Sequence, residues 1–310
     1  MGSKDAICDE IIKLFPKAGN FYDLFGGGFS VTHAMLLRRS KHYKNFHFNE
    51  IRPGVCELIQ KAIKGEYNYN VFKPKFISRE EFLDKLDKDA YIKLCWSFGN
   101  NGKDYMFSKQ LEPYKKSMHN AIIFNDFDSL ACKVMKMDSF KEGYTVKEKR
   151  FFLRNKIETY RKTKIPEFLF PYLKEEQLDQ LERLERLDQL QQLQRLERLK
   201  FYNLSYEKIK IKENSIIYCD PPYLGTVEYD GGFDHKKFYD WASENPNPVF
   251  ISEYNISDPR LKVVFKIKKR SLISSDKKKF NEKEERVYAN QAAIKAMILN
   301  HSKKPQTLEQ

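Results

Sequence analysis

The cysteines of this 310-residue chain form no recognisable pairs. Cys8, Cys56, Cys95, Cys132 and Cys219 are scattered, with no C-x-x-C motif and no histidine cluster at metal-ligand spacing. This distribution argues against a disulfide framework and against a zinc site, and it predicts reduced thiols. We therefore expect a cytoplasmic protein without a bound metal.

Long apolar runs are also absent. No stretch approaches the roughly 20 consecutive apolar residues that a membrane-spanning helix needs. The first residues, MGSKDAICDEIIKLFP, are too polar for a signal peptide. The sequence therefore predicts a soluble protein with no membrane partner.

Acidic side chains are in the minority. The chain has 43 Asp and Glu against 56 Lys and Arg, which gives a formal net charge of +13. Such a surplus favours a polyanionic partner, most often nucleic acid, and a basic surface without a partner is the alternative. A hydrophobic content of 41% and an aromatic content of 14% indicate a folded globular protein with a substantial core.

A glycine-rich turn is the first motif in the chain. DLFGGG occupies 23–28, where 21–25 predicts a short buried strand and a helix is expected after the glycines. A second strand, NFHFNE at 45–50, ends in Glu50, about 25 residues beyond the glycines. Strand, glycine turn and helix in this order begin a nucleotide-binding unit, and an acid at this distance accepts hydrogen bonds from ribose hydroxyls.

Another predicted strand, SIIYCD, ends in Asp220-Pro221-Pro222-Tyr223. Both prolines have a fixed φ and no N–H, so the segment is rigid and its carbonyls are free acceptors. The Asp220 carboxylate and a proline carbonyl can together accept both hydrogens of an amino group, while Tyr223 offers a face to an aromatic base. Acceptors placed in this way stabilise the positive charge that develops when the nitrogen attacks an electrophile. Taken alone, the motif also fits an ordinary turn.

The remaining pattern predicts an α/β core divided by an insertion. Strands are expected at 248–252 and 261–269, and a last strand and helix within 287–298. The core pattern is interrupted by more than 100 residues between the second strand and the Asp220 strand. The expected domains are a core of 1–65 with 200–310 and an insertion of 66–199.

Within the insertion, leucine recurs at every third position from Leu178 to Leu199. On a helix of 3.6 residues per turn each step rotates about 300°, so the leucines drift around the axis and form no single coiled-coil seam. Favourable pairs such as Asp179–Arg183, and the absence of Gly and Pro, still predict a helix over 174–200. Two interpretations remain open: a tolerated repeat that projects as a helix, or an arm for packing or self-association.

Three segments follow one another in the chain, with a long insertion before the third: DLFGGG (23–28), NE (49–50) and CDPPY (219–223). Together they resemble a Dam-type DNA adenine-N6 methyltransferase of the D12 class and alpha group, with phage-encoded members the most similar. The resemblance runs from Gly2 to about Asn290. It implies a Rossmann-like α/β core that binds S-adenosyl-L-methionine and a largely helical insertion that recognises the target. The implied reaction is methyl transfer to N6 of a flipped-out adenine in double-stranded DNA.

The resemblance also implies roles for single residues. Gly2-Ser3-Lys4 is similar to the end of the family's N-terminal cofactor motif, which places Lys4 near the methyl donor, and FYNLSYEKI (201–209) resembles the segment that lines the cofactor's adenine. The positions that match cofactor-binding motifs are Lys4, Asp23, Phe25, Gly26, Gly27, Gly28, Glu50 and Asp220. The positions that match the catalytic motif are Asp220, Pro221, Pro222 and Tyr223.

The stretch SFGNNGKDYMFSKQLEPYK (97–115) resembles the family's DNA-contacting segment. Ser97 stands where the family has arginine, so the sequence predicts no particular recognition site. Asn100, Asn101 and Tyr105 are expected to fill the gap left by the flipped base or to read its neighbours, and a polar surface loop is the alternative. The lysines expected to contact phosphates are Lys103, Lys109, Lys115 and Lys116.

Three alternative functions use the same residues. An N-methyltransferase acting on RNA adenine or on a protein amide more often carries Asn in place of Asp220 and a short gap before it, whereas the gap here is about 190 residues. A non-catalytic DNA-binding or assembly protein would leave the glycine turn and the Asp220–Tyr223 motif without a function. An NAD-dependent oxidoreductase is disfavoured because the first turn lacks G-x-G-x-x-G.

Overall fold

The computed structural model describes residue 4 and the ranges 7–162, 196–224, 232–270 and 282–302. The chain divides into two compact units, which we call the core unit (Gly2–Cys56 and Leu193–Gln310) and the insertion unit (Glu57–Gln192). Both boundaries lie several residues before the expected ones at 65 and 200. The chain leaves the core unit within the helix α3 (Val55–Ile63).

The core unit is built on one seven-stranded sheet with the order β3-β2-β1-β4-β5-β7-β6. β1 to β5 are parallel to their neighbours, and β7 is antiparallel to both β5 and β6. The direction of strand succession reverses between β1 and β4, which is where doubly wound sheets bind ligands beyond the carboxyl ends of their strands. The strands are β1 (Asn20–Asp23), β2 (Asn45–Asn49), β3 (Leu199–Tyr202), β4 (Ser215–Cys219), β5 (Val249–Glu253), β6 (Lys262–Arg270) and β7 (Glu282–Ala289).

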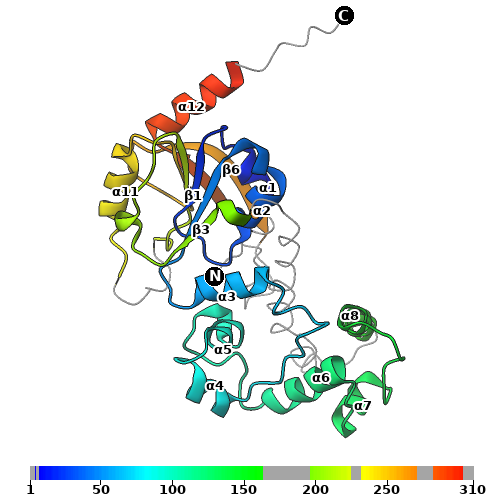
Figure 1. The fold of residues 1–310 in the computed structure, drawn as a ribbon. Helices are drawn as coiled ribbons and strands as arrows, with labels where there is room; N and C mark the ends of the chain where they lie inside the picture. Colours follow the sequence, from blue (N-terminus) through cyan, green and yellow to red (C-terminus); the bar gives the residue numbers. More distant parts are fainter. Residues whose placement is uncertain (1–3, 5–6, 163–195, 225–231, 271–281, 303–310) are drawn as a thin grey trace, which may run out of the picture. The chain divides into compact units, whose positions relative to one another are not determined.

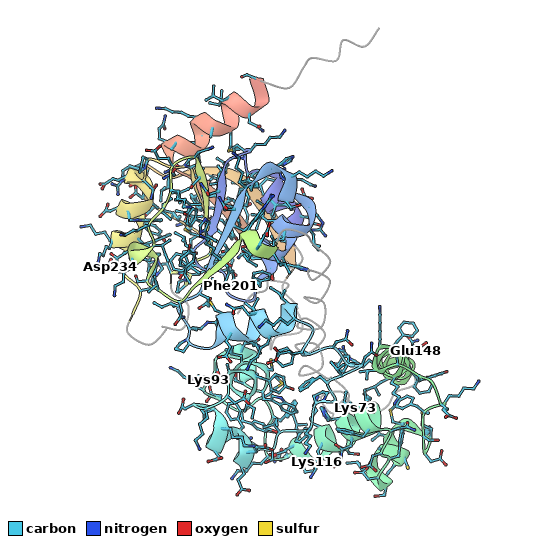
Figure 2. The ribbon with its side chains drawn as sticks, in the orientation of Figure 1. Lys73, Lys93, Lys116, Glu148, Phe201 and Asp234 are labelled. Atoms are coloured by element: carbon cyan, nitrogen blue, oxygen red, sulfur yellow. The ribbon has the colours of Figure 1, made fainter. Side chains whose placement is uncertain are left out.

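Helices cover both faces of this sheet: α1 (Cys8–Lys13) and α2 (Ser30–Arg38) lie on one, and α11 (His235–Glu244) lies on the other (Figure 1). Asp234, labelled in Figure 2, caps α11 by accepting a hydrogen bond from the Lys237 N–H at 2.9 Å. The last described helix, α12 (Gln291–Ser302), directly follows β7. The architecture confirms the α/β prediction.

Aromatic residues fill the face covered by α1 and α2. Phe15, just after α1, contacts Phe21, Tyr218 and Phe250 on three neighbouring strands, with ring centroids 5.6, 5.7 and 5.0 Å apart. Because side chains alternate along a strand, Tyr22 points to the opposite face. The sheet is therefore buried on both sides, as expected for parallel strands.

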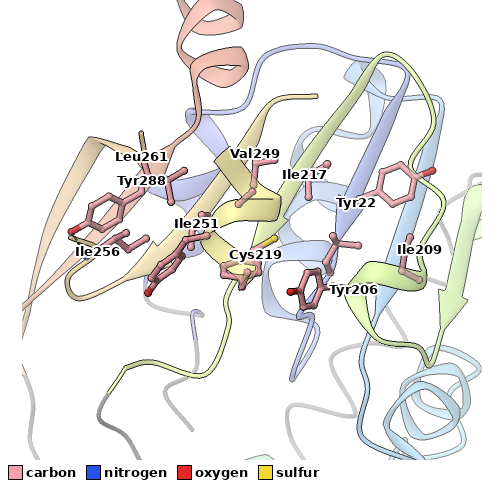
Figure 3. Packing of buried hydrophobic residues seen from close by; sticks show 14 residues of the cluster. Tyr22, Tyr206, Ile209, Ile217, Cys219, Val249, Ile251, Ile256, Leu261 and Tyr288 are labelled. Atoms are coloured by element: carbon pink, nitrogen blue, oxygen red, sulfur yellow. Dashed lines mark hydrogen bonds between the residues drawn. The ribbon is translucent and has the colours of Figure 1, made fainter. Parts of the chain in front are cut away.

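The face toward α11 carries a second apolar cluster (Figure 3). Ile217 and Cys219 of β4, Ile251 of β5 and Tyr288 of β7 line it, and Phe238 of α11 is fully buried against them. These contacts tie β7 to the strands that carry the predicted site.

Asn290 joins the elements that follow the site. Its Oδ1 accepts hydrogen bonds from the Val249 N–H at 3.1 Å and the Ala293 N–H at 2.9 Å. Its Nδ2 donates to the carbonyls of Ala242 and Asn245 at 3.0 and 3.1 Å. One buried amide thus links the end of α11, the start of β5 and the start of α12.

All strands expected in the core are present with shifted ends, but the end of the helix predicted over 174–200 is wrong. Leu196–Arg198 forms a 3₁₀ turn, and Leu199 begins β3, where it pairs with Phe46 of β2. Pairing with β2 and burial of Leu199 override the helical propensity of the repeat. Positions 174–195 lie outside the described residues.

The described part of the insertion unit is largely helical. Three of its helices begin with a capping side chain: Ser78, Asp89 and Asp128 each accept a hydrogen bond from a backbone N–H of the first turn. The α-helices that the structure describes wholly within this unit are α4 (Arg79–Lys85), α5 (Ala90–Cys95), α6 (Glu112–Phe124), α7 (Ser129–Met135) and α8 (Val146–Lys162).

Candidate active site

Three predicted carboxylates lie at the carboxyl edge of the parallel strands. Asp23 is the last residue of β1, Glu50 follows β2 and Asp220 follows β4. Asp23 is in register with Phe48 of β2 and with Tyr218 of β4. The parallel register therefore brings the three acids to one edge, at the point where the strand order reverses.

The glycine turn presses against β2. A Cβ on Gly26 would lie 1.9 Å from Cε2 of Phe48, and the Gly26 N–H donates to the Asn49 carbonyl at 2.9 Å. Gly27 has a φ of 51°, in the left-handed region that favours glycine. A Cβ on Gly28 would meet nothing within 4 Å. The turn is thus closed at Gly26 and open at Gly28, where a ligand can approach the backbone.

Glu50 fixes the shape of this turn. Its Oε2 accepts a hydrogen bond from the Gly27 N–H at 2.8 Å, and its Oε1 accepts from the Arg52 N–H and Nε, both at 3.0 Å. Oε2 has a second lone pair, so Glu50 can also accept from a hydroxyl. Its role as a ribose ligand remains a prediction that this geometry allows.

Asp23 is buried with one oxygen unsatisfied. Thr32 Oγ1 donates to Oδ2 at 2.7 Å, whereas Oδ1 has no hydrogen-bond partner within the described structure. Burial raises the pKa of Asp23 to about 7. A buried acceptor without a partner beside an open glycine turn suits a ligand with a cationic amino group, and S-adenosyl-L-methionine has one. The residues present therefore fit this cofactor.

Phe25 anchors the turn to the cluster beneath α11. Its ring centroid lies 5.6 Å from that of Tyr206 and 5.4 Å from that of Phe238. Tyr206 belongs to the segment predicted to line the cofactor's adenine, and the Asn49 Nδ2 donates to the Leu204 carbonyl in the same segment at 2.9 Å. The structure therefore places that segment beside the glycine turn.

Lys4 joins the catalytic motif to Glu285, a residue that the sequence prediction missed. Lys4 Nζ lies 3.0 Å from Asp220 Oδ1, forms an ion pair with Glu285 Oε1 and donates to the Tyr223 hydroxyl. The Tyr223 hydroxyl in turn donates to Glu285 Oε1 at 2.8 Å. The side chains of Lys4 and Glu285 are only 7% and 3% exposed.

The charges of this cluster support one another. Burial by itself lowers the pKa of Lys4, but the carboxylates of Asp220 and Glu285 outweigh burial and raise that pKa above its ordinary value. Burial raises the pKa of Asp220, and Lys4 opposes the shift. Two carboxylates against one ammonium leave a net negative site, which stabilises positive charge developing on a bound amine.

β5 supplies a second missed carboxylate. Glu253 Oε2 accepts from the Leu224 N–H at 3.2 Å and Oε1 accepts from the Tyr254 N–H at 2.7 Å. Burial raises the pKa of Glu253 to about 7. The rings of Tyr254 and Tyr223 meet edge to face, with centroids 4.6 Å apart. Glu253 thus orders the residues on either side of the ring that is predicted to stack on the base.

Glu253 could have been predicted from the sequence, whereas Glu285 could not. Glu253 directly ends an apolar strand, as Asp220 and Glu50 do, so the same rule would have found it. Glu285 lies inside EERVYA, and only the antiparallel direction of β7 brings it to the carboxyl edge of the sheet. That direction is not encoded in the local pattern.

In the insertion unit, the predicted DNA-contacting stretch forms a tight loop. Ser97 and Tyr105 close it through an isolated β-bridge, and the Gly102 N–H donates to Ser97 Oγ at 2.9 Å. Asn101 Oδ1 accepts from the Lys103 N–H at 2.9 Å, and Asn100 Nδ2 donates to a backbone carbonyl at 2.8 Å. Both asparagines therefore help to shape the loop, whatever else they contact.

Two of the predicted DNA contacts are buried. Tyr105 is 7% exposed and its hydroxyl donates to the Ile77 carbonyl at 2.6 Å. Lys115 is 1% exposed, with Nζ 5.4 Å from the ring centroid of Phe107. Because both side chains pack inside the insertion unit, we do not retain them among the proposed DNA contacts. The other lysines of the predicted set, Lys103, Lys109 and Lys116, are exposed (Lys116 is labelled in Figure 2).

Phe98 is an exposed aromatic residue in the same loop that sequence reasoning passed over. It is 66% exposed, and its N–H donates to the Asp104 carbonyl at 2.7 Å. Positive φ angles at Gly99, Asn100 and Gly102 let the chain turn tightly around it. An aromatic face on a basic unit is a stacking surface for a nucleic-acid base.

Neither a metal site nor a membrane helix is found in the described part of the chain. There, no three or more His, Cys, Asp or Glu side chains gather in a way that would hold a metal ion. Its helices are too short or too polar to span a bilayer.

The doubly wound sheet and the open glycine turn beside Asp23 fit an S-adenosyl-L-methionine-dependent methyltransferase. More specifically, the family model of the D12 class N6 adenine-specific DNA methyltransferases matches residues 1–245, and the chain belongs to this family. It is accordingly an enzyme that transfers a methyl group to adenine N6 in DNA, with S-adenosyl-L-methionine as the donor.

The likeness to solved structures is weaker. The rRNA methyltransferase aviRa from Streptomyces viridochromogenes at 1.5 Å shares 10% sequence identity over 96% of this chain and 88% of that chain, with a TM-score of 0.36. The same protein at 2.4 Å gives 10% identity, coverage of 95% and 87%, and a TM-score of 0.35. No curated protein matches the sequence.

Proposed function

We propose that Asp220, Pro221 and Tyr223 hold an adenine that has been flipped out of duplex DNA. The observation that supports this is the fixed catalytic motif: Lys4 pairs with Asp220 at 3.0 Å, while Tyr254 meets the Tyr223 ring at 4.6 Å. Acceptor and ring are therefore oriented before a substrate arrives. Extruding the base costs a few kcal/mol, which its contacts in the pocket must offset.

In this proposal the amine is activated by placement. Asp220 and the Pro221 carbonyl accept the two N6 hydrogens, and Pro222 keeps the backbone rigid, so the nitrogen lone pair points in one direction. Tyr223 stacks on the base. S-adenosyl-L-methionine supplies an electrophilic methyl group when bound. Orientation of this kind can contribute about 7–11 kcal/mol to lowering a barrier.

The cofactor would be held by residues on β1 and β2. Asp23 Oδ1 would accept from its amino group, and Glu50 would accept from its ribose. The glycine turn, from Phe25 to Gly28, would let it approach the backbone. Lys4, paired with Asp220, would lie between this site and the amine site.

The insertion unit would bind the DNA around the flipped base. Lys103, Lys109 and Lys116 would contact phosphates, which gives an affinity that falls with salt and carries little sequence information. Asn100, Asn101 and Phe98 would face the bases, because they share the loop with the exposed Lys103. The recognised sequence would depend on this loop.

Two further expectations remain as proposals. The leucine repeat, most of which lies outside the described residues, would support self-association, and a mass that stays monomeric over a wide concentration range in sedimentation would refute this. A cytoplasmic location follows from the reduced cysteines and the DNA substrate. Fractionation of cells that produce the protein would check it.

The test is a methylation assay with labelled S-adenosyl-L-methionine and mixed-sequence duplex DNA, followed by digestion to nucleosides. We expect label in N6-methyladenine from the wild type and none from Asp220→Ala. Asp240→Ala, which removes a partly exposed aspartate of α11 that pairs with Arg260, is the matched control and should retain activity. Label in RNA alone, in a parallel reaction, would overturn the proposal.

A further inference from the structure

We propose that Glu285 is a positioning residue of the methyltransferase site, which orients Tyr223 directly and Asp220 through Lys4. This inference rests on the proposed role of Asp220 and Tyr223 in holding adenine. It assigns a function to β7, a strand that follows residue 245, where the family match ends. Glu285 would touch neither the base nor the cofactor.

The register of β7 explains how a residue so late in the chain reaches the site. Glu253, the last residue of β5, pairs with Arg286. Because β7 is antiparallel, Glu285 lies one position beyond the carboxyl end of β5. This is the edge of the sheet at which Asp220 leaves β4.

The alternation of side chains places Glu285 on the correct face. Val287 of β7 pairs with Ser252, and the Ser252 hydroxyl lies 2.8 Å from the Tyr218 hydroxyl. Tyr218 contacts Phe15, so this is the face covered by α1. Glu285, two positions from Val287, points the same way.

Lys4 approaches the cluster from the same side. Its carbonyl accepts a hydrogen bond from the Cys8 N–H at 2.7 Å, at the start of α1. The beginning of α1 and the beginning of β7 therefore bring opposite charges together on one face of the sheet. The ion pair between Lys4 and Glu285 therefore connects segments far apart in the sequence to the catalytic motif at Asp220.

One oxygen of Glu285 contacts both Lys4 and Tyr223. Oε1 pairs with Lys4 Nζ and accepts from the Tyr223 hydroxyl. Lys4 Nζ also lies 4.8 Å from the centroid of the Tyr223 ring. Without the Glu285 charge, Lys4 would be balanced by Asp220 alone, and the Tyr223 hydroxyl would donate to a weaker, neutral acceptor. Both the acceptor and the stacking face presented to adenine would then shift.

The decisive variant is Glu285→Gln, which keeps the size of the side chain and removes its charge. Glu284→Gln is the matched control: it makes the same change one residue earlier, where Glu284 pairs with Arg286 and Lys266 at a partly exposed position. Glu285→Asp keeps the charge but withdraws the oxygens by one methylene. It provides a second test if Glu285→Gln does not fold.

The measurements are kcat and KM for DNA, KM for S-adenosyl-L-methionine, and the thermal midpoint. We expect Glu285→Gln to lower kcat about 10- to 100-fold, the cost of a small misplacement of reacting groups, with KM for the cofactor nearly unchanged. Glu284→Gln should keep the wild-type kcat. Glu285→Asp should fold and lose activity in the same way.

A double-variant cycle separates positioning from simple structural support. Tyr223→Phe removes only the hydroxyl, so its effect on kcat should not add to that of Glu285→Gln if both act through the same contact. A wild-type kcat in folded Glu285→Gln or Glu285→Asp would overturn the inference. So would full additivity, or an activity loss explained entirely by unfolding.

The proposed function can fail independently of this inference. If the wild type methylates RNA and not DNA, the DNA assignment falls. The same variants compared on the RNA substrate would then decide the role of Glu285, because its contacts are with Lys4 and Tyr223.

Discussion

Two buried lysines show how differently the core unit and the insertion unit use the same residue type. Lys4 in the core unit lies against two carboxylates and a tyrosine hydroxyl. Lys115 in the insertion unit lies over the ring of Phe107. The first lysine forms part of a charged site at the edge of the sheet, whereas the second packs within a helical unit. A match to a family motif therefore does not establish the role of a lysine until the surroundings of its side chain are known.

The same contrast holds for the predicted functional residues as a group. In the core unit, Asp23, Glu50 and Asp220 lie at one sheet edge because each ends or follows a parallel strand. In the insertion unit, Tyr105 and Lys115 of the predicted set are buried, whereas four other members are exposed: Asn101, Lys103, Lys109 and Lys116. The topology of the sheet brings the three carboxylates of the core unit together. In the insertion unit, the orientation of each side chain on its helix or loop decides whether it is buried or exposed.

The largest expected effect tests the core site by removing only a charge. Asp220→Asn keeps the shape of the side chain but gives up the negative charge that faces the amine and Lys4. We expect kcat to fall about 10²- to 10³-fold, the usual result of removing one preorganised electrostatic group. Single-turnover methylation of duplex DNA measures it. Activity within a factor of a few of the wild type would remove Asp220 from the chemistry.

The next effect tests the closed end of the glycine turn against its open end. Gly26→Ala would drive a methyl group into the Phe48 ring, and overpacking of this kind costs about 1–3 kcal/mol of unfolding free energy. Gly28→Ala meets no neighbour and should leave the unfolding free energy close to that of the wild type. Urea unfolding of both variants compares them. Equal destabilisation would contradict the close contact at Gly26.

A third prediction concerns the pH dependence of stability. Since burial raises the pKa of Asp23 from 3.8 to about 7, the folded chain holds this proton more tightly than the unfolded chain does. The contribution of Asp23 to stability is therefore complete below pH 3.8 and is lost as the pH rises through 7. Asp23→Asn, which cannot ionise, should be more stable than the wild type at pH 8, by at least about 1.4 kcal/mol, the value of one pKa unit.

The measurement for Asp23 is the urea midpoint of both proteins between pH 4 and pH 8. The difference should shrink toward pH 4, where the wild-type carboxyl is protonated in the folded state. A difference that does not change with pH would mean that Asp23 titrates normally.

The smallest effect distinguishes two adjacent lysines of α6. Lys116→Ala should weaken DNA binding and reduce the slope of log affinity against log salt by about 1, as the loss of one phosphate contact does. Lys115→Ala should lower the thermal midpoint and leave that slope unchanged. Binding titrations at several salt concentrations, with a melting curve for each variant, measure both. Equal slopes for all three proteins would exclude Lys116 from the DNA contact.

Sequence patterns placed Glu50 and Asp220 at one sheet edge because each directly follows a buried strand, and parallel strands bring their carboxyl ends to the same edge. Asp23, the last residue of β1, was expected at the cofactor site only from the family resemblance. Glu285 could not be predicted, because its place depends on the direction of β7. Tyr105 and Phe98 illustrate a further limit: both are aromatic residues of one loop, yet only the tertiary structure shows that one is buried and the other exposed.

The position of β7 has a consequence for synthesis of the protein on the ribosome. β7 is the last of the described strands, yet it lies between β5 and β6 in the sheet. A nascent chain that already contains Lys4 and Asp220 still lacks β7, the strand that joins β6 to the rest of the sheet. It also lacks the carboxylate of Glu285, which pairs with Lys4. Such late, long-range closure is slow in folding. We therefore expect chains that end before β7 to lack methyltransferase activity.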